Sequence, residues 1–404
     1  MQSPEHVDGS SADFTPDDFT PDDFTPAQYA RSRQRKREIK PVRQLSAALS
    51  LALACVLGFT RLGSDLIGQL ARPFGGNWVA AALLGPVALV LAGTVLGLPT
   101  AARAEVVNRR WGLSRRGWPL FWADQAKGAV LGALLLAFAA LGWYALIRAL
   151  PGIWWLVAAL AAALLAFVLS FLLPVVVEPM FNKFEPLPEG PLRERLFALA
   201  AQAGVPVREI LVSDASKRTT VLNAYVSGIG RSRRIVIWDT TLTTIDEDQI
   251  TFIAAHELGH AARRDVVWGT AVGAIGLAGG VCLIAAALHR RALLSAAGVA
   301  QIADPRSFAL VLALGAVFGG VGAPLFNVYS RRIERRADQF GLDLTRDPAT
   351  VVECWRHLAV ADLADLAPGW VARHWTGTHP PIPDRIGHAR SWAAGHAAAA
   401  PAAD

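Results

Sequence analysis

The sequence is short of cysteine and short of charge. Three cysteines, Cys55, Cys282 and Cys354, are scattered over 404 residues, and none belongs to a CxxC pair. This spacing argues against a thiolate metal site and against a disulfide framework. Only 18% of the residues are charged, whereas 53% are hydrophobic. Soluble globular proteins carry about 25% charged residues, so the chain is too apolar to be wholly soluble, and membrane spans are expected.

The formal net charge is nevertheless +6. A basic balance is typical of nucleic-acid-binding domains, but the Lys and Arg residues of this chain flank apolar segments. Positive residues collect in this way at the cytoplasmic edge of membrane proteins. We therefore expect a lipid bilayer as the partner of these charges, and no nucleic acid.

The N-terminal segment is polar and repetitive. The stretch "DFTPDDFTPDDFTP" (13–26) repeats a unit that ends in proline, and a basic stretch, 31–43, follows it. A unit of Asp, Thr and Pro with one aromatic residue cannot build a core, which predicts a disordered acidic tail. A docking motif for a partner is the alternative. We assign 1–43 to this tail.

Six apolar runs follow the tail. They cover 45–59, 78–98, 129–147, 153–177, 266–288 and 308–328. The later runs have about the 20 residues that a bilayer core requires. The first is shorter, but it begins more than 40 residues into the chain without a clear cleavage site after it, so we interpret it as a retained helix rather than a signal peptide. The sequence predicts six spans, with seven as the alternative.

Charge and glycine suggest how these spans are arranged. The basic segments 31–43, 100–127 and 331–336 place both termini in the cytoplasm by the positive-inside rule. The last two runs are rich in glycine, and small residues let membrane helices approach closely. We expect these two helices to pack together through their glycines. The glycines are Gly269, Gly273, Gly276, Gly280, Gly315, Gly319 and Gly322.

A stretch of soluble character, 179–264, separates the fourth and fifth runs. "PLRERLFALAAQAG" predicts an amphipathic helix ended by Gly204. "REILVSDAS" and "NAYVSGIGRSRRIVIWDTTL" are typical of strands, with "GIGRSRR" as the turn of a hairpin. "DEDQITFIAAHELGHAARRD" returns to helical spacing, with acidic residues in its first turn. We expect this last helix to continue without a break into the fifth span.

That helix carries the motif HExxH. His256 and His260 are four residues apart, so one turn of helix brings both imidazoles to the same face, where they can bind one Zn²⁺. Glu257 lies beside the metal, where a general base for the attacking water is needed. These three residues predict a zinc peptidase of the zincin type.

A zincin requires a third protein ligand. "SRRIERRAD" (330–338) offers Glu334, on a helix that continues the sixth run. If the last two spans pack together, Glu334 reaches the histidines, and Asp338 can orient one of them through its ring N–H. In the alternative interpretation both carboxylates only neutralise neighbouring arginines on a solvated face.

The motifs together resemble the type I CAAX prenyl protease family of integral membrane zinc metalloproteases, with the heat-shock protease HtpX as a more distant relative. The similarity runs from about 174 to 385. It rests on "EPMFNKFEPLPEGPLRERLFALA", "SKRTTVLNAYVSGIGRSRRIVIWDTTL", "HELGH", "SRRIERRADQFG" and "THPPIPDRI", in the order of the family. The resemblance implies His256, His260 and Glu334 as ligands of Zn²⁺ and Glu257 as the catalytic base.

The resemblance also implies roles that spacing alone does not give. Asn223, with Ala224 and Tyr225, would belong to a strand that lines the substrate groove and pairs with an extended peptide. His379 and Arg385 would lie by the site and stabilise the oxyanion. The membrane helices would enclose a chamber into which the zinc opens.

These features predict a mainly α, polytopic membrane protein with a small α+β zincin-type domain at the cytoplasmic face. We assign 44–178 to the first four spans, 179–264 to the catalytic domain, 265–330 to the last two spans and 331–404 to a soluble region that completes the zinc site. With few cysteines and no signal sequence, a bacterial cell membrane is the expected location.

The sequence does not identify the substrate. Ala261 and Asp265 stand where the prenyl protease branch has an aromatic residue and often a histidine, which is closer to HtpX. We expect a peptide or protein substrate that is membrane-associated or lipid-modified, with quality control of membrane proteins as the alternative. A metal-binding scaffold or transporter would need polar residues in mid-span, and the six runs hold almost none.

Overall fold

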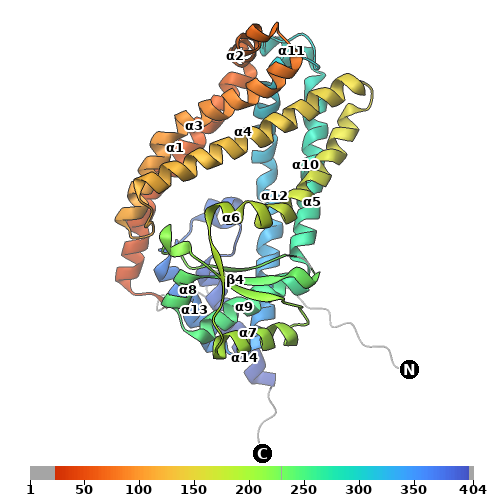
Figure 1. The fold of residues 1–404 in the computed structure, drawn as a ribbon. Coiled ribbons are helices and arrows are strands. Elements are labelled where there is room, and N and C mark those ends of the chain that lie inside the picture. Colours follow the sequence, from red (N-terminus) through yellow and green to blue (C-terminus); the bar gives the residue numbers. More distant parts are fainter. Residues whose placement is uncertain (1–22, 229, 400–404) are drawn as a thin grey trace, which may run out of the picture.

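The computed structural model describes residues 23–228 and 230–399. Long helices form one part of the molecule, and a soluble domain with a small sheet lies at one end of them (Figure 1). Within the described residues, six helices are long and apolar enough to cross a membrane, as the sequence predicts. They are α1 (Pro26–Phe59), α3 (Trp78–Arg110), α4 (Trp118–Ala149), α5 (Trp154–Val176), α10 (Asp265–Leu288) and α12 (Phe308–Thr345). Two short helices, α2 (Arg61–Ala71) and α11 (Arg291–Ala296), lie at the end far from the soluble domain.

The first helix begins earlier than the sequence suggests. The hydroxyl of Thr25 accepts a hydrogen bond from the backbone N–H of Gln28 at 3.2 Å, and the Gln28 side chain accepts one from the N–H of Thr25 at 2.7 Å. This capping box, with Pro26 as the first helical residue, starts the helix. The basic stretch 31–43 is therefore helical, not a tail. Residues 1–22 of the expected tail lie outside the described part of the chain.

Helices α10 and α12 contact each other, but their glycines do not mediate a close approach. A Cβ atom added at six of the seven expected positions would meet no other atom within 4 Å, and at Gly315 it would only touch Ile284, at 3.9 Å. The close approach is instead between α1 and α12, where a Cβ atom at Gly58 would overlap Ala313. The expected packing of α10 against α12 is therefore confirmed, but the expected role of their glycines was wrong, because glycine spacing alone does not say which partner a face meets.

The soluble domain contains a four-stranded sheet in the order β1-β2-β4-β3. The strands are β1 (Phe184–Pro186), β2 (Glu209–Ser213), β3 (Ala224–Ser227) and β4 (Arg234–Trp238). Strands β2 and β4 are parallel, whereas β3 and β4 form the predicted antiparallel hairpin, with Ala224 opposite Ile237. Strand β3 is thus an edge strand, and it lies against helix α9 (Glu247–Ala262).

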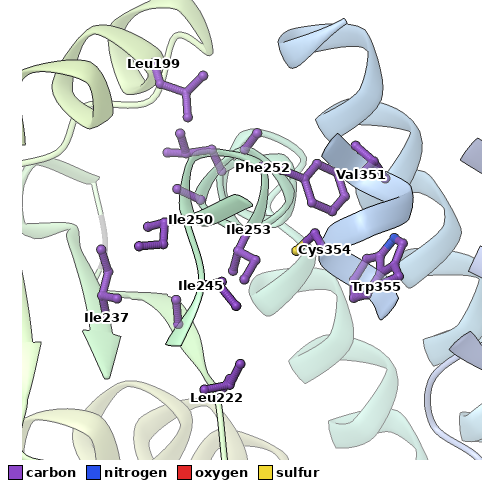
Figure 2. Close-up of a cluster of buried hydrophobic side chains, with 14 of the residues drawn as sticks. Leu199, Leu222, Ile237, Ile245, Ile250, Phe252, Ile253, Val351, Cys354 and Trp355 are labelled. Atoms are coloured by element: carbon purple, nitrogen blue, oxygen red, sulfur yellow. The ribbon is translucent and has the colours of Figure 1, made fainter. Parts of the chain in front are cut away.

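Helix α9 is the centre of the soluble domain. Figure 2 shows it between the sheet, which contributes Ile237, and α13 (Pro348–Ala361), which contributes Trp355. Phe252 packs edge-on against Trp355, with ring centroids 5.5 Å apart. Burial of each such side chain stabilises the fold by about 1.5–3 kcal/mol. Helices α7 (Pro191–Gln202), α8 (Asp239–Thr244) and α14 (Ile382–Ala399) complete the domain.

The link between α3 and α4 binds the segment that leads into β3. The N–H of Arg115 donates to the carbonyl of Arg218 at 3.0 Å. The guanidinium of Arg218 in turn makes a bidentate pair with Asp124 of α4, with both bonds at 3.1 Å. Such planar pairs fix orientation as well as distance. The helical part of the molecule therefore positions the edge strand.

Helix α9 does not run on into α10. It ends at Ala262, α10 begins at Asp265, and Arg264 between them has a φ of 57°. A left-handed residue just past a helix end stops the helix, although it is unusual for a residue other than Gly or Asn. The expected continuous helix was therefore wrong, and the break changes which side chains meet at the site.

Candidate metal centre and active site

Three of the predicted side chains converge on one point. Ligand atoms of His256, His260 and Glu334 all lie within 4.8 Å of one another. The two Nε2 atoms are 3.2 Å apart, and the carboxylate oxygens of Glu334 lie 3.5 and 3.6 Å from them. Two imidazoles and a carboxylate are a donor set of catalytic zinc sites. The donor types and their convergence fit a zinc ion.

Glycines bring the two helices of this cluster together. A Cβ atom at Gly259 of α9 would lie 3.0 Å from the Phe340 ring, and one at Gly341 of α12 would lie 2.9 Å from the Phe252 ring. A side chain at either position would force the facing phenylalanine ring to shift. Gly259 in HELGH therefore has a packing role, because it lets α12 approach closely enough to place Glu334 within reach of the histidines.

Each histidine is held from behind by a carboxylate. Asp338 lies 2.9 Å from Nδ1 of His256, and Asp265 lies 3.0 Å from Nδ1 of His260. Such pairs leave Nε2 free for a metal and fix the orientation of the ring. Burial lowers the pKa of His256, but hydrogen bonds to Asp338 and Glu334 outweigh it and raise the pKa to about 9. The carboxylates around His256 therefore favour a positive charge between the ligand side chains.

The sequence marks Asp265 only as a departure from the prenyl protease pattern and does not predict its contact with His260. On an unbroken helix, five residues correspond to a rotation of about 140°, which would turn this carboxylate away from His260. The left-handed Arg264 turns the chain so that Asp265 faces the histidine, and Arg336 of α12 binds its other oxygen at 3.1 Å. The acidic residue after "HAARR" was the available signal.

We expect Asp265→Ala to weaken zinc binding about 10- to 100-fold, the usual effect of removing a carboxylate behind a ligand histidine. Competition with a chelator of known affinity measures this directly. Asp248→Ala is the matched control, because Asp248 lies exposed in the first turn of α9. Equal zinc affinities for the two variants would contradict the role of Asp265.

Glu257 lines a cavity of about 290 Å³ together with the ligand His260. Strand β3, membrane helix α5 and the start of α10 form the walls of this cavity. Its lining includes Ser170, Phe171, Tyr225, Val226, His260, Val266 and Val267. Burial raises the pKa of Glu257, and a raised pKa improves a carboxylate as a proton acceptor near neutral pH.

The residues around β3 have three different environments. The backbone of Asn223 is held by Thr241, whose hydroxyl lies 2.9 Å from both its N–H and its carbonyl, and the Asn223 side chain is exposed. Ala224 points into the core and is 4% exposed. Tyr225 lines the cavity, and its hydroxyl donates to Glu178 at 2.9 Å. Ala224 therefore offers a substrate only its backbone.

His379 reaches the metal cluster from a loop. Its Nε2 lies 3.5 Å from Glu334, and its side chain is 61% exposed. Two residues of α12 hold this loop: Asn327 donates to the carbonyl of Trp375 at 2.7 Å, and Arg331 donates to that of Gly377 at 2.6 Å. Sequence reasoning did not single out either anchor, because an arginine beyond a span suggests only a membrane edge.

Loss of the Arg331 anchor is expected to reduce turnover without loss of metal. In Arg331→Ala the loop that carries His379 is released, and misplacement of a catalytic group by about 1 Å can cost about 100-fold in rate. We expect a fall of at least about tenfold in kcat, measured together with zinc content. Arg332→Ala is the control, because Arg332 is the next residue along the helix and is exposed. Equal kcat values for the two variants would argue against the role of Arg331 as an anchor.

Arg385 lies behind the cluster rather than in the cavity. Its Nε donates to Asp338 at 2.8 Å, and its guanidinium packs 3.6 Å over the Trp355 ring. It is 8% exposed, and its nearest approach to Glu334 is 3.5 Å. In this position it holds Asp338, whereas the oxyanion role expected from the resemblance needs a group that faces the substrate.

Comparisons with known proteins show the family of the chain. Residues 186–393 match peptidase family M48, and residues 9–183 match the family described as CAAX prenyl protease N-terminal, five membrane helices. An uncharacterized metalloprotease, YhfN, of Bacillus subtilis is 31% identical over 310 residues, which cover 74% of this chain and 71% of that protein.

One further sequence relative and one solved structure are similar to this chain. A CAAX prenyl protease 1 homolog of Oryza sativa is 44% identical, but over 97 residues that cover 24% of this chain and 23% of that protein. The crystal structure of S. mikatae Ste24p has the same fold, with a TM-score of 0.83 over 91% of this chain and 90% of that chain at 21% identity. The chain belongs to peptidase family M48, as a membrane metalloprotease similar to the CAAX prenyl proteases.

Proposed function

We propose that the protein is a zinc-dependent endopeptidase that cleaves peptide bonds in membrane-associated or lipid-modified proteins. The observation that carries this proposal is the cavity beside Glu257 and His260, whose walls include Ser170 and Phe171 of membrane helix α5. A chain held at the bilayer reaches such a cavity without leaving the membrane surface.

His256, His260 and Glu334 would hold the zinc, which when bound polarises the scissile carbonyl and acidifies a water molecule. Glu257 accepts the proton of the attacking water and passes it to the leaving amine. His379, exposed beside Glu334, donates a hydrogen bond to the carbonyl oxygen as that oxygen gains negative charge. Asp338 and Asp265 fix the orientation of the two imidazole rings throughout the reaction.

The substrate binds as an extended strand in this proposal. Strand β3 is an edge strand, so its outer backbone groups are available for pairing with a peptide. The exposed side chain of Asn223, just before this strand, adds a hydrogen bond to the peptide backbone. Alternate side chains of the peptide then point into the cavity beside Tyr225.

The soluble domain and both termini lie in the cytoplasm of a bacterial cell in this proposal. The basic segments 31–43 and 331–336 and the soluble domain are at the same end of the helices, and positive residues mark the cytoplasmic side. Labelling of single introduced cysteines in intact cells tests the orientation. A soluble domain labelled from outside the cell would contradict it.

The test of the function compares one peptide with and without a lipid anchor, at equal concentration, with the purified protein in bilayer discs. We expect the anchored peptide to be cleaved at least about tenfold faster, because anchoring raises its effective concentration at the site. Equal rates would contradict a membrane-associated substrate. Absence of cleavage of both peptides, together with activity on a misfolded membrane protein, would favour the quality-control alternative that Ala261 and Asp265 suggest.

A further inference from the structure

The last Asp-Phe-Thr-Pro unit of the N-terminal repeat is bound to the soluble domain. Asp23 is 6% exposed and Phe24 is 4% exposed. The Asp23 carboxylate accepts hydrogen bonds from Arg356 of α13 at 3.0 Å and from both terminal nitrogens of Arg390 of α14. One carboxylate thus bridges two helices and pairs with a guanidinium group from each.

Each residue of the unit has a different contact. The Phe24 ring belongs to the core of the soluble domain and packs edge-on against Tyr29, with centroids 6.0 Å apart. Thr25 caps α1, and Pro26 is its first residue. The following helix is also attached, because Ser32 donates to the carbonyl of Ala364 at 2.6 Å. The soluble domain therefore binds the Asp and Phe side chains of the unit, whereas Thr and Pro start the helix that follows it.

The same unit occurs twice more in the chain. Asp-Phe-Thr-Pro stands at 13–16 and again at 18–21, outside the described residues. An open groove of about 400 Å³ between α13 and α14 adjoins the site. Arg356 and Arg390 line it together with Pro348, Val352, Ala393 and one acidic residue, Glu353. The two arginines bind a carboxylate through charge-assisted hydrogen bonds, and the adjoining core takes up the Phe24 ring, so the ligand that fits is an acidic residue followed by an aromatic one.

We propose that the surface of α13 and α14 around Arg356 and Arg390 is a binding site for the Asp-Phe-Thr-Pro unit, and that the two upstream units of this chain are equivalent ligands of that site. The repeat then supplies three interchangeable copies of one ligand. This role is separate from the proposed peptidase function, since it involves neither zinc nor substrate.

The position of this site connects it to the metal centre. Arg356 follows Trp355, which packs under Arg385, and Arg390 is on the same helix as Arg385. A bound unit therefore fastens together the two helices that hold Arg385 against Asp338. Loss of all three units is expected to loosen this support, whereas loss of one is not.

The test uses the full-length protein and a fluorescent Asp-Asp-Phe-Thr-Pro peptide, with binding followed by anisotropy. In the variant with Phe14, Phe19 and Phe24 all changed to Ala, the site is vacated, and saturable binding is expected. The wild-type protein should bind the peptide at least about tenfold more weakly, because its own units compete at about millimolar effective concentration. Phe24→Ala alone should behave as wild type, since an upstream unit takes the place of the lost one.

Two controls identify the site. Adding Arg356→Gln and Arg390→Gln to the triple variant should abolish binding, and a peptide with Ala in place of Phe should not bind. If the triple variant is unstable, changing Asp13, Asp18 and Asp23 to Asn keeps the aromatic rings and should likewise strengthen peptide binding relative to wild type. No binding to either vacated variant, or equal binding to wild type, would overturn the proposal. If Phe24→Ala alone binds the peptide as tightly as the triple variant does, the three units are not equivalent.

Discussion

Glu257→Gln is expected to reduce peptide hydrolysis by about a thousandfold, because it removes the only group at the cavity that we assign to accept the proton of water. Gln has the size of Glu and leaves both histidines in place, so zinc content should not change. The measurement is a single-turnover cleavage assay paired with metal analysis of the same sample. Loss of activity without loss of metal separates a catalytic base from a ligand.

The matched control for this experiment is Glu247→Gln, the same change at the exposed start of the same helix. It should retain both activity and zinc. If Glu257→Gln cleaves as well as this control, Glu257 is not the base. If it loses zinc as well, the side chain contributes to the metal site and the assignment of ligands is incomplete.

Glu334→Ala is expected to remove both metal and activity. Without the carboxylate only two imidazoles remain, below the three protein ligands of catalytic zinc sites. The loss of affinity should exceed the roughly 100-fold effect of removing a residue behind the ligands. Removal of metal from the wild type with a chelator should give the same inactive state. Adding zinc back should restore the activity of the wild type but not that of Glu334→Ala.

Glu353→Ala on α13 is the control for Glu334, since its carboxylate is 48% exposed and pairs with Arg356 and His357 of the same helix. It should keep zinc and activity. Retention of full zinc content in Glu334→Ala would show that another residue completes the site. Asp338 would then be the nearest candidate, because it already contacts His256.

The sequence predicts the parts of this molecule that depend on local pattern. The spans follow from runs of apolar residues, the hairpin of β3 and β4 from alternation around a glycine turn, and the metal cluster from four-residue spacings in two helices. Glu334 was predictable as a partner of His256 because its helix continues the sixth span and the histidine helix directly precedes the fifth, which limits where the two can meet.

The features that the sequence did not reveal depend on contacts between distant segments or on unusual backbone geometry. No glycine or proline in the sequence predicts the break after α9, because the residue that makes the turn is an arginine, Arg264, with a left-handed backbone conformation. Docking of Asp23 depends on Arg356, which follows 333 residues later. A repeat that looks too polar to fold therefore contributes a buried aromatic side chain to the core.

The most direct test of the account is X-ray absorption at the zinc edge on the purified membrane protein. Two imidazoles and one carboxylate predict zinc surrounded by nitrogen and oxygen at about 2.0–2.2 Å, with no sulfur. The imidazole signal should fall in His260→Ala and stay unchanged in His396→Ala, at the exposed end of α14. Sulfur scattering at about 2.3 Å, or a spectrum unaltered by His260→Ala, would contradict a metal centre built from His256, His260 and Glu334.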